Sequence, residues 1–256
     1  MGEGCPEVTG RFRWDETTIG SVLRCDALEP YATHAFTTRS VAFRDGRDYD
    51  RLAALFSLSS AALITVKQVH ASDVLIVRTG ENAAEALEAD VVVAADSARV
   101  ACVRVADCVP VLLADRGRRA VAAVHAGWRG TLAGAAGAAV RALAGLGVPP
   151  DDLLAAIGPS IGPCCYQVDS PVRDRFVAAG ADVARWFLPD SGVKWKLDLW
   201  KANADQLVMA GVDPANIHVA GLCTFDHASA FFSFRREGPG TGRLVAAVRT
   251  TQAPLA

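Results

Sequence analysis

Short runs of aliphatic and β-branched residues recur along the chain, separated by charged and turn-forming residues. Runs of this length predict buried strands, whereas three longer segments carry apolar residues at helical spacing. Strands that alternate with helices in this way predict an α/β or α+β fold. The expected strands are residues 61–69, 73–77, 90–95, 99–105, 109–114, 119–125, 153–157, 216–221 and 243–249, and the expected helices are residues 131–146, 170–179 and 198–210.

The Pro/Gly clusters at residues 145–150, 158–163 and 238–242 are short, and the chain has no fixed-period repeat. Neither a linker nor a repeat array is indicated, so we expect one domain over residues 1–256. The sequence GPGTGR at 238–243 is predicted to be a turn, because a strand follows it where a dinucleotide-binding loop would lead into a helix.

Composition narrows the class of protein. Hydrophobic residues make up 51% of the chain and charged residues 21%, which predicts a well-packed globular protein. The net charge is −2 and the basic residues are scattered, so we expect a small-molecule ligand and no nucleic acid. We expect neither an export leader nor a membrane span, because no segment has the required apolar pattern. The seven cysteines are an odd number and, apart from the adjacent Cys164 and Cys165, are dispersed, which makes a poor disulfide framework and favours a cytoplasmic location.

Residues 106–131, ADCVPVLLADRGRRAVAAVHAGWRGT, contain two apolar runs joined by a short basic turn, a pattern that predicts a β-hairpin. If Arg116 and Gly117 form the loop, Cys108 lies opposite His125. Opposed side chains have Cβ atoms about 4.5–5.5 Å apart, from which both can reach one metal ion. A bulge at Pro110 would shift the pairing by one residue and turn Cys108 to the other face.

A third metal ligand is expected among His34, His70, His218 and His227. His70 follows the expected strand 61–69 and precedes a polar turn, which places it at the rim of a sheet. His218 lies inside an alternating strand and is expected to be a structural sheet residue. His34 and His227 remain alternative candidates for the third ligand. Two histidines, one cysteine and a fourth position left to water form the ligand set of a catalytic zinc site.

Several longer blocks resemble the signature blocks of one family. They are KQVH (67–70), ADCVPVLL (106–113), VHAGWRGT (124–131), IGPSIGPCCYQV (157–168), LDLWKAN (197–203), LCT (222–224) and FFSFRREGPGTGR (231–243). On these blocks, which extend over about residues 37–249, the chain is identified as a member of the laccase-domain family, also called multicopper polyphenol oxidase-like and described as purine nucleoside phosphorylases. The resemblance implies a layered α/β sandwich with mixed β-sheets, and zinc bound by His70, Cys108 and His125.

Family members are described with phosphorolysis of adenosine, inosine and methylthioadenosine and with deamination of adenosine, so purine nucleosides and phosphate are the expected partners. Deamination needs a proton carrier, and Asp107 is the first candidate, either as a direct acid/base or as a carboxylate that orients a histidine ligand. Phosphorolysis needs an anion pocket, and Arg129 either contacts phosphate at the start of the Ala-rich helix or caps a surface turn. Arg39 and Arg235 are further candidates by resemblance. Cys165 lies in a Gly/Pro-rich loop and either lines the pocket or is a structural thiol.

Other functions would use the same residues. Copper in the same site would support the older description as a polyphenol oxidase, although five histidines are too few for several copper sites. Cys108 as a catalytic nucleophile with His125 as its base would make a metal-free hydrolase. A purine-binding protein without enzymatic activity is a third alternative, and its mark would be binding without turnover.

Overall fold

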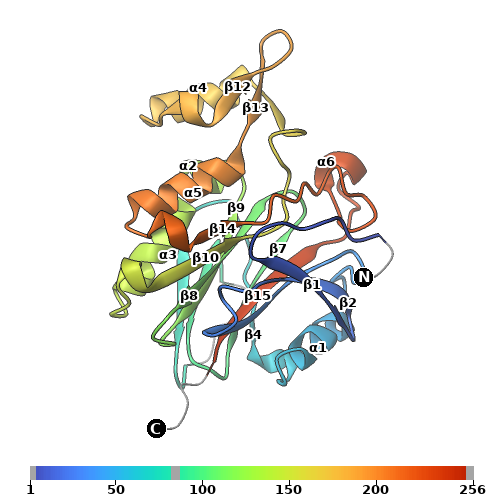
Figure 1. The fold of residues 1–256 in the computed structure, drawn as a ribbon, viewed down its shortest axis with the longest axis vertical. Helices are drawn as coiled ribbons and strands as arrows, with labels where there is room; N and C mark the ends of the chain where they lie inside the picture. Colours follow the sequence, from blue (N-terminus) through green and yellow to red (C-terminus); the bar gives the residue numbers. More distant parts are fainter. Residues whose placement is uncertain (1–3, 82–86, 252–256) are drawn as a thin grey trace.

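Two mixed β-sheets pack face to face at the centre of the molecule (Figure 1), a computed structural model that describes residues 4–81 and 87–251. Neighbouring strands are antiparallel except for three parallel pairs, one in the first sheet and two in the second. The first sheet consists, in order, of β1 (Phe12–Thr17), β2 (Gly20–Cys25), β3 (Ala32–Thr37), β15 (Leu244–Thr250), β7 (Val100–Val105) and β4 (Leu63–Ile64). The second consists of β14 (Ile217–Val219), β10 (Leu153–Ile157), β8 (Val109–Asp115), β9 (Val121–Ala126), β6 (Val91–Ala95) and β5 (Val74–Arg78).

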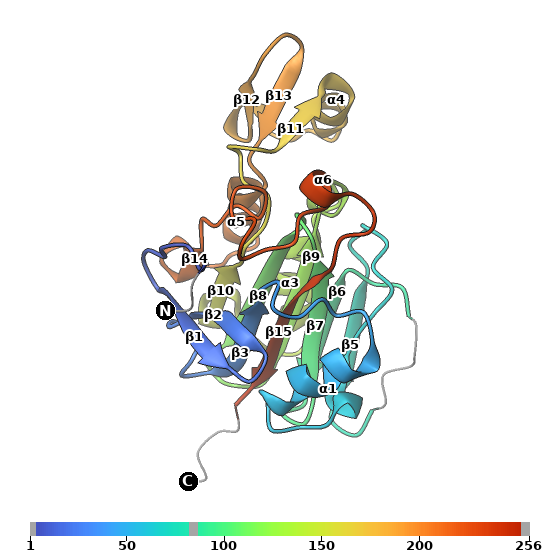
Figure 2. The same ribbon diagram turned by 90° about the vertical axis from the view of Figure 1, so that its right-hand side faces the viewer.

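Helices cover the outer face of each sheet, so the sandwich has four layers (Figure 2). On the first sheet, α1 (Gly46–Ala54) packs through Leu52. On the second, α3 (Ala135–Ala144) packs through side chains such as Leu143, and α5 (Leu199–Met209) packs through side chains such as Leu207. The expected layered α/β sandwich with mixed sheets is confirmed. Among the described residues, no helix is long and apolar enough to cross a membrane.

Alternation along the strands assigns side chains to these layers. In β8, Val111 and Leu113 face the helices, whereas Leu112 and Ala114 face the first sheet. In β9, Ala123 likewise faces the first sheet. Side chains that continue the inter-sheet faces of β8 and β9 therefore emerge at one end of the sandwich.

A small antiparallel sheet projects from the sandwich together with α4 (Ser170–Ala178) (Figures 1 and 2). Phe176 of α4 is buried against Trp186 and Phe187, with ring centroids 6.1 Å and 5.2 Å away. The helix predicted over 170–179 is confirmed, whereas the strands of this sheet were not predicted. They are β11 (Gln167–Asp169), β13 (Lys194–Leu197) and β12 (Phe187–Pro189).

Two predicted elements are wrong in their bounds. The helix predicted over 131–146 is divided into α2 (Trp128–Leu132) and α3, because Gly134 between them adopts a left-handed conformation with φ of 78°. The strand predicted over 61–69 is confined to β4. Beyond β4, the side-chain amide of Gln68 hydrogen-bonds both the N–H and the carbonyl oxygen of Arg104 and takes the place of a strand ladder.

Candidate metal centre and active-site cavity

The hairpin of β8 and β9 brings Cys108 and His125 to the same end of the sandwich, although its register differs from the predicted one. Pro110, and not Cys108, lies opposite His125. The pairing is displaced by two residues, and a displacement by two keeps every side chain on its predicted face. Cys108 precedes β8 directly, continues its inter-sheet face and lies diagonal to His125.

The displacement arises in the turn. The buried carboxylate of Asp115 accepts hydrogen bonds from the backbone N–H groups of Gly117 and Arg119, both at 2.9 Å. It also pairs with the Arg119 guanidinium at 2.6 and 2.7 Å. These bonds close a loop over residues 116–119, which is longer than the predicted loop of Arg116 and Gly117.

His70, Cys108 and His125 converge, with one ligand atom each and all three atoms within 4.8 Å of one another. Sγ of Cys108 lies 3.9 Å from Nε2 of His70, and the centroids of the two imidazole rings are 4.8 Å apart. Imidazole nitrogen and thiolate sulfur are donors that suit zinc and copper. Gly127 leaves room here, because a Cβ at that position would lie 2.8 Å from Sγ of Cys108. The residues present fit one metal ion.

The other three histidines are not part of this cluster. His34 is fully buried in the first sheet, where the N–H of Cys25 donates to its Nε2 at 2.8 Å and its Nδ1 lies 3.3 Å from the carbonyl oxygen of Ala32. His218 lies in β14, in keeping with a structural sheet residue. His227 follows β14 in a turn and belongs to neither sheet.

A buried carboxylate that sequence analysis missed holds both histidines. Oδ1 of Asp90 lies 2.7 Å from Nδ1 of His125, which leaves Nε2 of that ring for a metal. Backbone N–H groups of Val69, His70 and Ala71 donate to the same carboxylate at 3.2, 3.0 and 2.7 Å. They fix a loop in which His70 has a left-handed φ of 63°. Carboxylates commonly orient metal-binding histidines in this way. The one signal in the sequence is an acidic residue directly before the apolar run of β6.

The charges within the cluster favour a thiolate. Burial raises the pKa of the Cys108 thiol, but the imidazoles of His125 and His70 outweigh burial and lower this pKa to about 6. Burial lowers the pKa of His125, but the Cys108 thiolate and the Asp90 carboxylate raise it to about 9. At neutral pH, Cys108 is therefore in the form that binds metals and acts as a nucleophile.

A cavity of about 540 Å³ opens onto the cluster, and this volume lies within the range of small-molecule sites. Its charged lining is mainly basic, with Arg104, Arg235, Arg243 and Lys67 around the single acid Asp107 among the described lining residues. The remaining lining residues are Gln68, His70, Val105, Ala106, Cys108, His125 and the aromatic residues Trp128, Tyr166 and Phe234. Basic and aromatic side chains thus share one cavity with the cluster of His70, Cys108 and His125.

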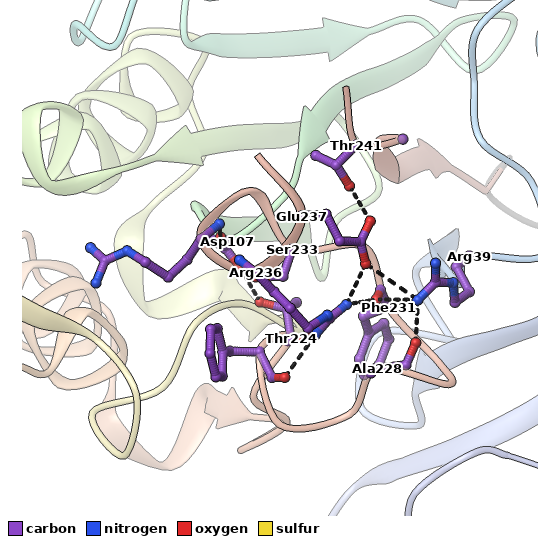
Figure 3. Close-up of polar contacts among 12 residues, drawn as sticks. Arg39, Asp107, Thr224, Ala228, Phe231, Ser233, Arg236, Glu237 and Thr241 are labelled. Carbon is purple, nitrogen blue, oxygen red and sulfur yellow. Dashed lines mark hydrogen bonds and ion pairs between the residues drawn. The ribbon is translucent and has the colours of Figure 1, made fainter. Parts of the chain in front are cut away.

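Asp107 lines the cavity, and its carboxylate is directed toward α6 (Phe234–Glu237) (Figure 3). Oδ1 accepts a hydrogen bond from the Thr224 hydroxyl at 2.7 Å, and Oδ2 accepts one from the N–H of Arg235 at 2.6 Å. Two roles were predicted for Asp107, and the carboxylate that lies within hydrogen-bond distance of His125 is that of Asp90. Asp107 positions the backbone of Arg235.

Arg39 is not among the described residues that line the cavity. Its guanidinium donates to the carbonyl oxygen of Ala228, lies 3.3 Å from Oε1 of Glu237 and stacks 4.9 Å from the centroid of the Phe232 ring. Figure 3 shows Glu237 between Arg39 and Arg236. Arg39 thus braces the segment that leads into α6.

Arg235 lines the cavity, with its guanidinium 5.2 Å from the centroid of the Tyr166 ring. Arg129 and Cys165 are not among the described lining residues. Arg129 is exposed on α2 and stacks on Trp128, 4.3 Å from the ring centroid. The thiol of Cys165 donates to a carboxylate outside the cavity. The cationic groups that the sequence analysis missed are those of Lys67, Arg104 and Arg243.

Comparison with known proteins points to one family. Residues 45–251 match the family model described as multi-copper polyphenol oxidoreductase laccase. The chain is 42% identical to a purine nucleoside phosphorylase of Pseudomonas aeruginosa over 151 residues, which are 58% of this chain and 60% of that protein. It is 37% identical to the purine nucleoside phosphorylase YfiH of Escherichia coli over 194 residues, 76% of each chain. The match thus spans less than two thirds of the length of the first relative.

Two solved structures share the fold. The hypothetical protein YfiH of Bacillus licheniformis superposes with a TM-score of 0.83 at 28% identity, covering 90% of this chain and 96% of that one. YlmD of Geobacillus stearothermophilus superposes with a TM-score of 0.81 at 29% identity and the same coverage. The likeness extends over nearly the whole arrangement of sheets and helices.

Proposed function

This chain belongs to the multi-copper polyphenol oxidoreductase laccase family, and we propose that it is an enzyme that cleaves purine nucleosides with inorganic phosphate. The observation that carries this proposal is a cavity in which aromatic rings and arginines lie beside the cluster of His70, Cys108 and His125. Relatives named purine nucleoside phosphorylase support the substrate class. Adenosine, inosine and methylthioadenosine are the proposed nucleosides.

Aromatic faces suit a purine base. Trp128 comes from α2, Tyr166 from the loop before β11 and Phe234 from α6, and all three line the cavity. Stacking of one base on an aromatic side chain contributes about 1–3 kcal/mol. The Arg235 guanidinium over Tyr166 combines a stacking surface with a positive charge, as a nucleoside and a phosphate require together.

Phosphorolysis needs an anion beside the ribose. An oxygen of phosphate attacks C1′ while the C1′–N9 bond breaks, and its electron pair leaves with the purine, which takes up a proton. Arg104, Arg235 and Arg243 surround the cavity, and guanidinium groups bind phosphate through paired N–H groups. Asp107 holds the backbone of Arg235, and the carbonyl oxygen of Gln167 accepts a hydrogen bond from its guanidinium at 3.0 Å, so less of that side chain's freedom is lost when phosphate binds. Positioning and charge neutralisation are the contributions proposed for these residues.

Zinc is the proposed metal on His70, Cys108 and His125, because two histidines and one cysteine with an open position are typical of catalytic zinc. When bound, it would supply a Lewis acid beside the substrate. Asp90 would orient His125 for this purpose. Deamination of adenosine is proposed as a second activity of the same cavity, with Asp107, the acidic residue of the described lining, as the proton carrier.

One second candidate is favoured by a specific observation. Cys108, His125 and Asp90 form a thiolate, imidazole and carboxylate series, which is also the catalytic group of cysteine hydrolases. A hydrolase of this type does not use His70, whose ring nitrogen faces the same thiol, so the cluster favours a metal. Metal dependence separates the two functions, because removal of metal would abolish phosphorolysis and leave thiol-dependent hydrolysis.

Phenol oxidation by several copper ions is the less favoured function. Among the residues that the structure describes, only His70 and His125 bring imidazole nitrogens together in a metal-ligand cluster. Such a cluster has donors for a single ion, whereas four-electron reduction of oxygen by a laccase needs a multinuclear copper centre.

The experiment uses zinc-loaded, copper-free protein with each of the three nucleosides, with and without phosphate, followed by chromatography of the products. We expect a free purine and the corresponding ribose 1-phosphate only when phosphate is present, and inosine from adenosine in either case. Treatment with a chelator should remove these activities, and zinc should restore them. If none of the nucleosides is converted and copper-loaded protein oxidises phenols instead, the proposal is wrong.

A further inference from the structure

Three cysteines and one aspartate gather at a second place in the molecule. Cys164, Cys165, Cys223 and Asp226 each offer one ligand atom, and these four atoms lie within 4.8 Å of one another. None of the four is among the described residues that line the cavity. Neither nucleoside binding nor the cluster around His70 therefore accounts for them.

Asp226 is the common partner of the two adjacent cysteines. Its Oδ2 accepts a hydrogen bond from the Cys164 thiol at 3.0 Å, and its Oδ1 accepts one from the Cys165 thiol at 2.9 Å. Cys223 is buried, and its sulfur accepts a hydrogen bond from the N–H of Gly162 at 3.3 Å. Three sulfur atoms and a carboxylate thus converge from two segments that are far apart in the sequence.

Main-chain hydrogen bonds hold these two segments together independently of the side chains. Ser160 and Cys223 form a parallel β-bridge. The N–H of Ser160 donates to the carbonyl oxygen of Leu222 at 3.2 Å, and the N–H of Thr224 donates to that of Ser160 at 3.0 Å. The donor atoms are therefore placed by the fold, as a preorganised binding site requires.

We propose that Cys164, Cys165, Cys223 and Asp226 bind a second zinc ion in a structural site. Structural zinc sites use four protein ligands, most often with several thiolates, and leave no position for substrate. Zinc would replace the thiol protons, which are released to solvent. Cys164 and Asp226 are exposed, which gives the ion access.

Cations next to the cluster reduce the cost of its negative charge. Nζ of Lys196 donates to the carbonyl oxygen of Cys164 at 2.8 Å. The Arg236 guanidinium donates to the carbonyl oxygens of Thr224 and Phe225, both at 2.7 Å. Lys196 thus contacts the backbone of the proposed ligand Cys164, and Arg236 contacts the two residues between Cys223 and Asp226. Partners of metal ligands are commonly found in such positions.

A disulfide between the adjacent Cys164 and Cys165 is less favourable than zinc binding. Consecutive Cα atoms joined by a trans peptide are about 3.8 Å apart, whereas disulfides usually join Cα atoms about 4.4–6.8 Å apart. A bond between Cys164 and Cys165 would therefore be strained. All three cysteines are free thiols in the structure.

Zinc at this position would stabilise the wall of the cavity without contacting substrate. Tyr166, which lines the cavity, directly follows Cys165. Thr224, which donates to the Asp107 carboxylate, directly follows Cys223. The second ion would thus join the two segments that support Tyr166 and Asp107.

Zinc content of protein purified without added metal, measured by plasma mass spectrometry, is the first test. Wild-type protein should hold about two zinc ions per chain, and Cys108→Ser and Cys164→Ser/Cys165→Ser should each hold about one. Cys5→Ser is the matched control, because Cys5 is a free thiol outside both clusters, and it should retain the wild-type content. If wild-type protein holds a single zinc and Cys108→Ser retains it, the result would support this site while contradicting the zinc proposed at His70.

Cadmium provides a second readout, because its ultraviolet thiolate absorbance grows with the number of thiolate ligands. Relative to wild type, the amplitude should be about three quarters in Cys108→Ser and about one quarter in Cys164→Ser/Cys165→Ser. Asp226→Asn preserves volume and should fold normally, but it should release the second zinc at about 10-fold lower chelator concentration. Zinc that is lost entirely in Cys108→Ser, or a disulfide between Cys164 and Cys165 in the isolated protein, would overturn the proposal.

Discussion

Oδ1 of Asp90 lies 2.7 Å from Nδ1 of His125, while the backbone N–H groups of His70 and Ala71 donate to the same carboxylate. One buried acid therefore fixes the ring of one proposed metal ligand and the main chain of another. Asp90 is not itself a member of the ligand cluster. The distance between the two imidazoles consequently depends on a residue behind them.

We expect Asp90→Asn to weaken zinc binding at this cluster about 10- to 100-fold. The amide has one acceptor atom in place of two, so its NH₂ group would oppose either the backbone donors of the 69–71 loop or the ring of His125. Competition with a chromophoric chelator measures the affinity, and circular dichroism checks the fold. Glu88→Gln changes an exposed carboxylate nearby and should bind zinc as wild type does. An equal loss in both variants would contradict the specific role of Asp90.

Substitution of Gly127 tests whether the cluster of His70, Cys108 and His125 needs the space that the absent side chain leaves. Its backbone has φ of −70° and ψ of 179°, which alanine adopts without strain. An added Cβ would lie 2.8 Å from Sγ of Cys108 and 3.2 Å from Cδ2 of His70. Overpacking of this kind costs about 1–3 kcal/mol, so Gly127→Ala should bind zinc roughly 5- to 150-fold more weakly. Gly240→Ala, where a Cβ meets nothing within 4 Å, is the matched control, and unchanged affinity in Gly127→Ala would refute the argument.

The cluster of His70, Cys108 and His125 could be predicted from the sequence because two of its members lie where one hairpin begins and ends, next to each other at its open end. Alternation puts Cys108 and His125 on one face, and this result survives a turn two residues longer than predicted. The role of Asp90 could not be predicted, because its carboxylate accepts hydrogen bonds from backbone N–H groups 19 to 21 residues away, and such contacts leave no periodic pattern in the sequence. The carboxylate that binds the Cys165 thiol lies 61 residues away.

Periodicity also explains which parts of the fold were predicted. The central strands of the second sheet, β6, β8, β9 and β10, are buried on both faces and form continuous apolar runs. β1 is mostly half-buried and shows neither an apolar run nor clean alternation, so it was missed. Alanines on both sides of Gly134 continue the helical pattern, which hides the break between α2 and α3.

Substitution of Arg235 and of Arg129 tests which of these two arginines binds phosphate. Arg235 lines the cavity, whereas Arg129 is exposed on α2. A hydrogen bond to a charged group contributes about 1.5–3 kcal/mol, so Arg235→Ala should lower kcat/KM for phosphate about 10- to 150-fold. Arg129→Ala should reduce it much less, and adenosine deamination without phosphate should depend little on either residue. Steady-state kinetics at varied phosphate concentration measures this, and a larger loss in Arg129→Ala would place the phosphate elsewhere.

His34 makes the stability of the first sheet depend on pH. Burial lowers its pKa from an ordinary 6.5 to about 4, and the N–H of Cys25 donates to its unprotonated Nε2. Between these two values the unfolded chain binds a proton that the folded chain does not. Stability is therefore lost as the pH falls from 6.5 toward 4, and it is regained as the pH rises.

The difference between the two pKa values corresponds to about 3 kcal/mol in the free energy of unfolding. His34→Gln keeps an acceptor for the N–H of Cys25 and a donor for the carbonyl oxygen of Ala32, but it does not titrate in this range. Other groups, including the metal ligands, titrate in both proteins, so the difference between wild type and variant isolates His34. Urea unfolding at pH 7 and pH 4.5 should show a smaller loss of stability in His34→Gln than in wild type. Equal losses would mean that His34 is protonated in the folded protein, and its hydrogen bond from Cys25 would then have to break.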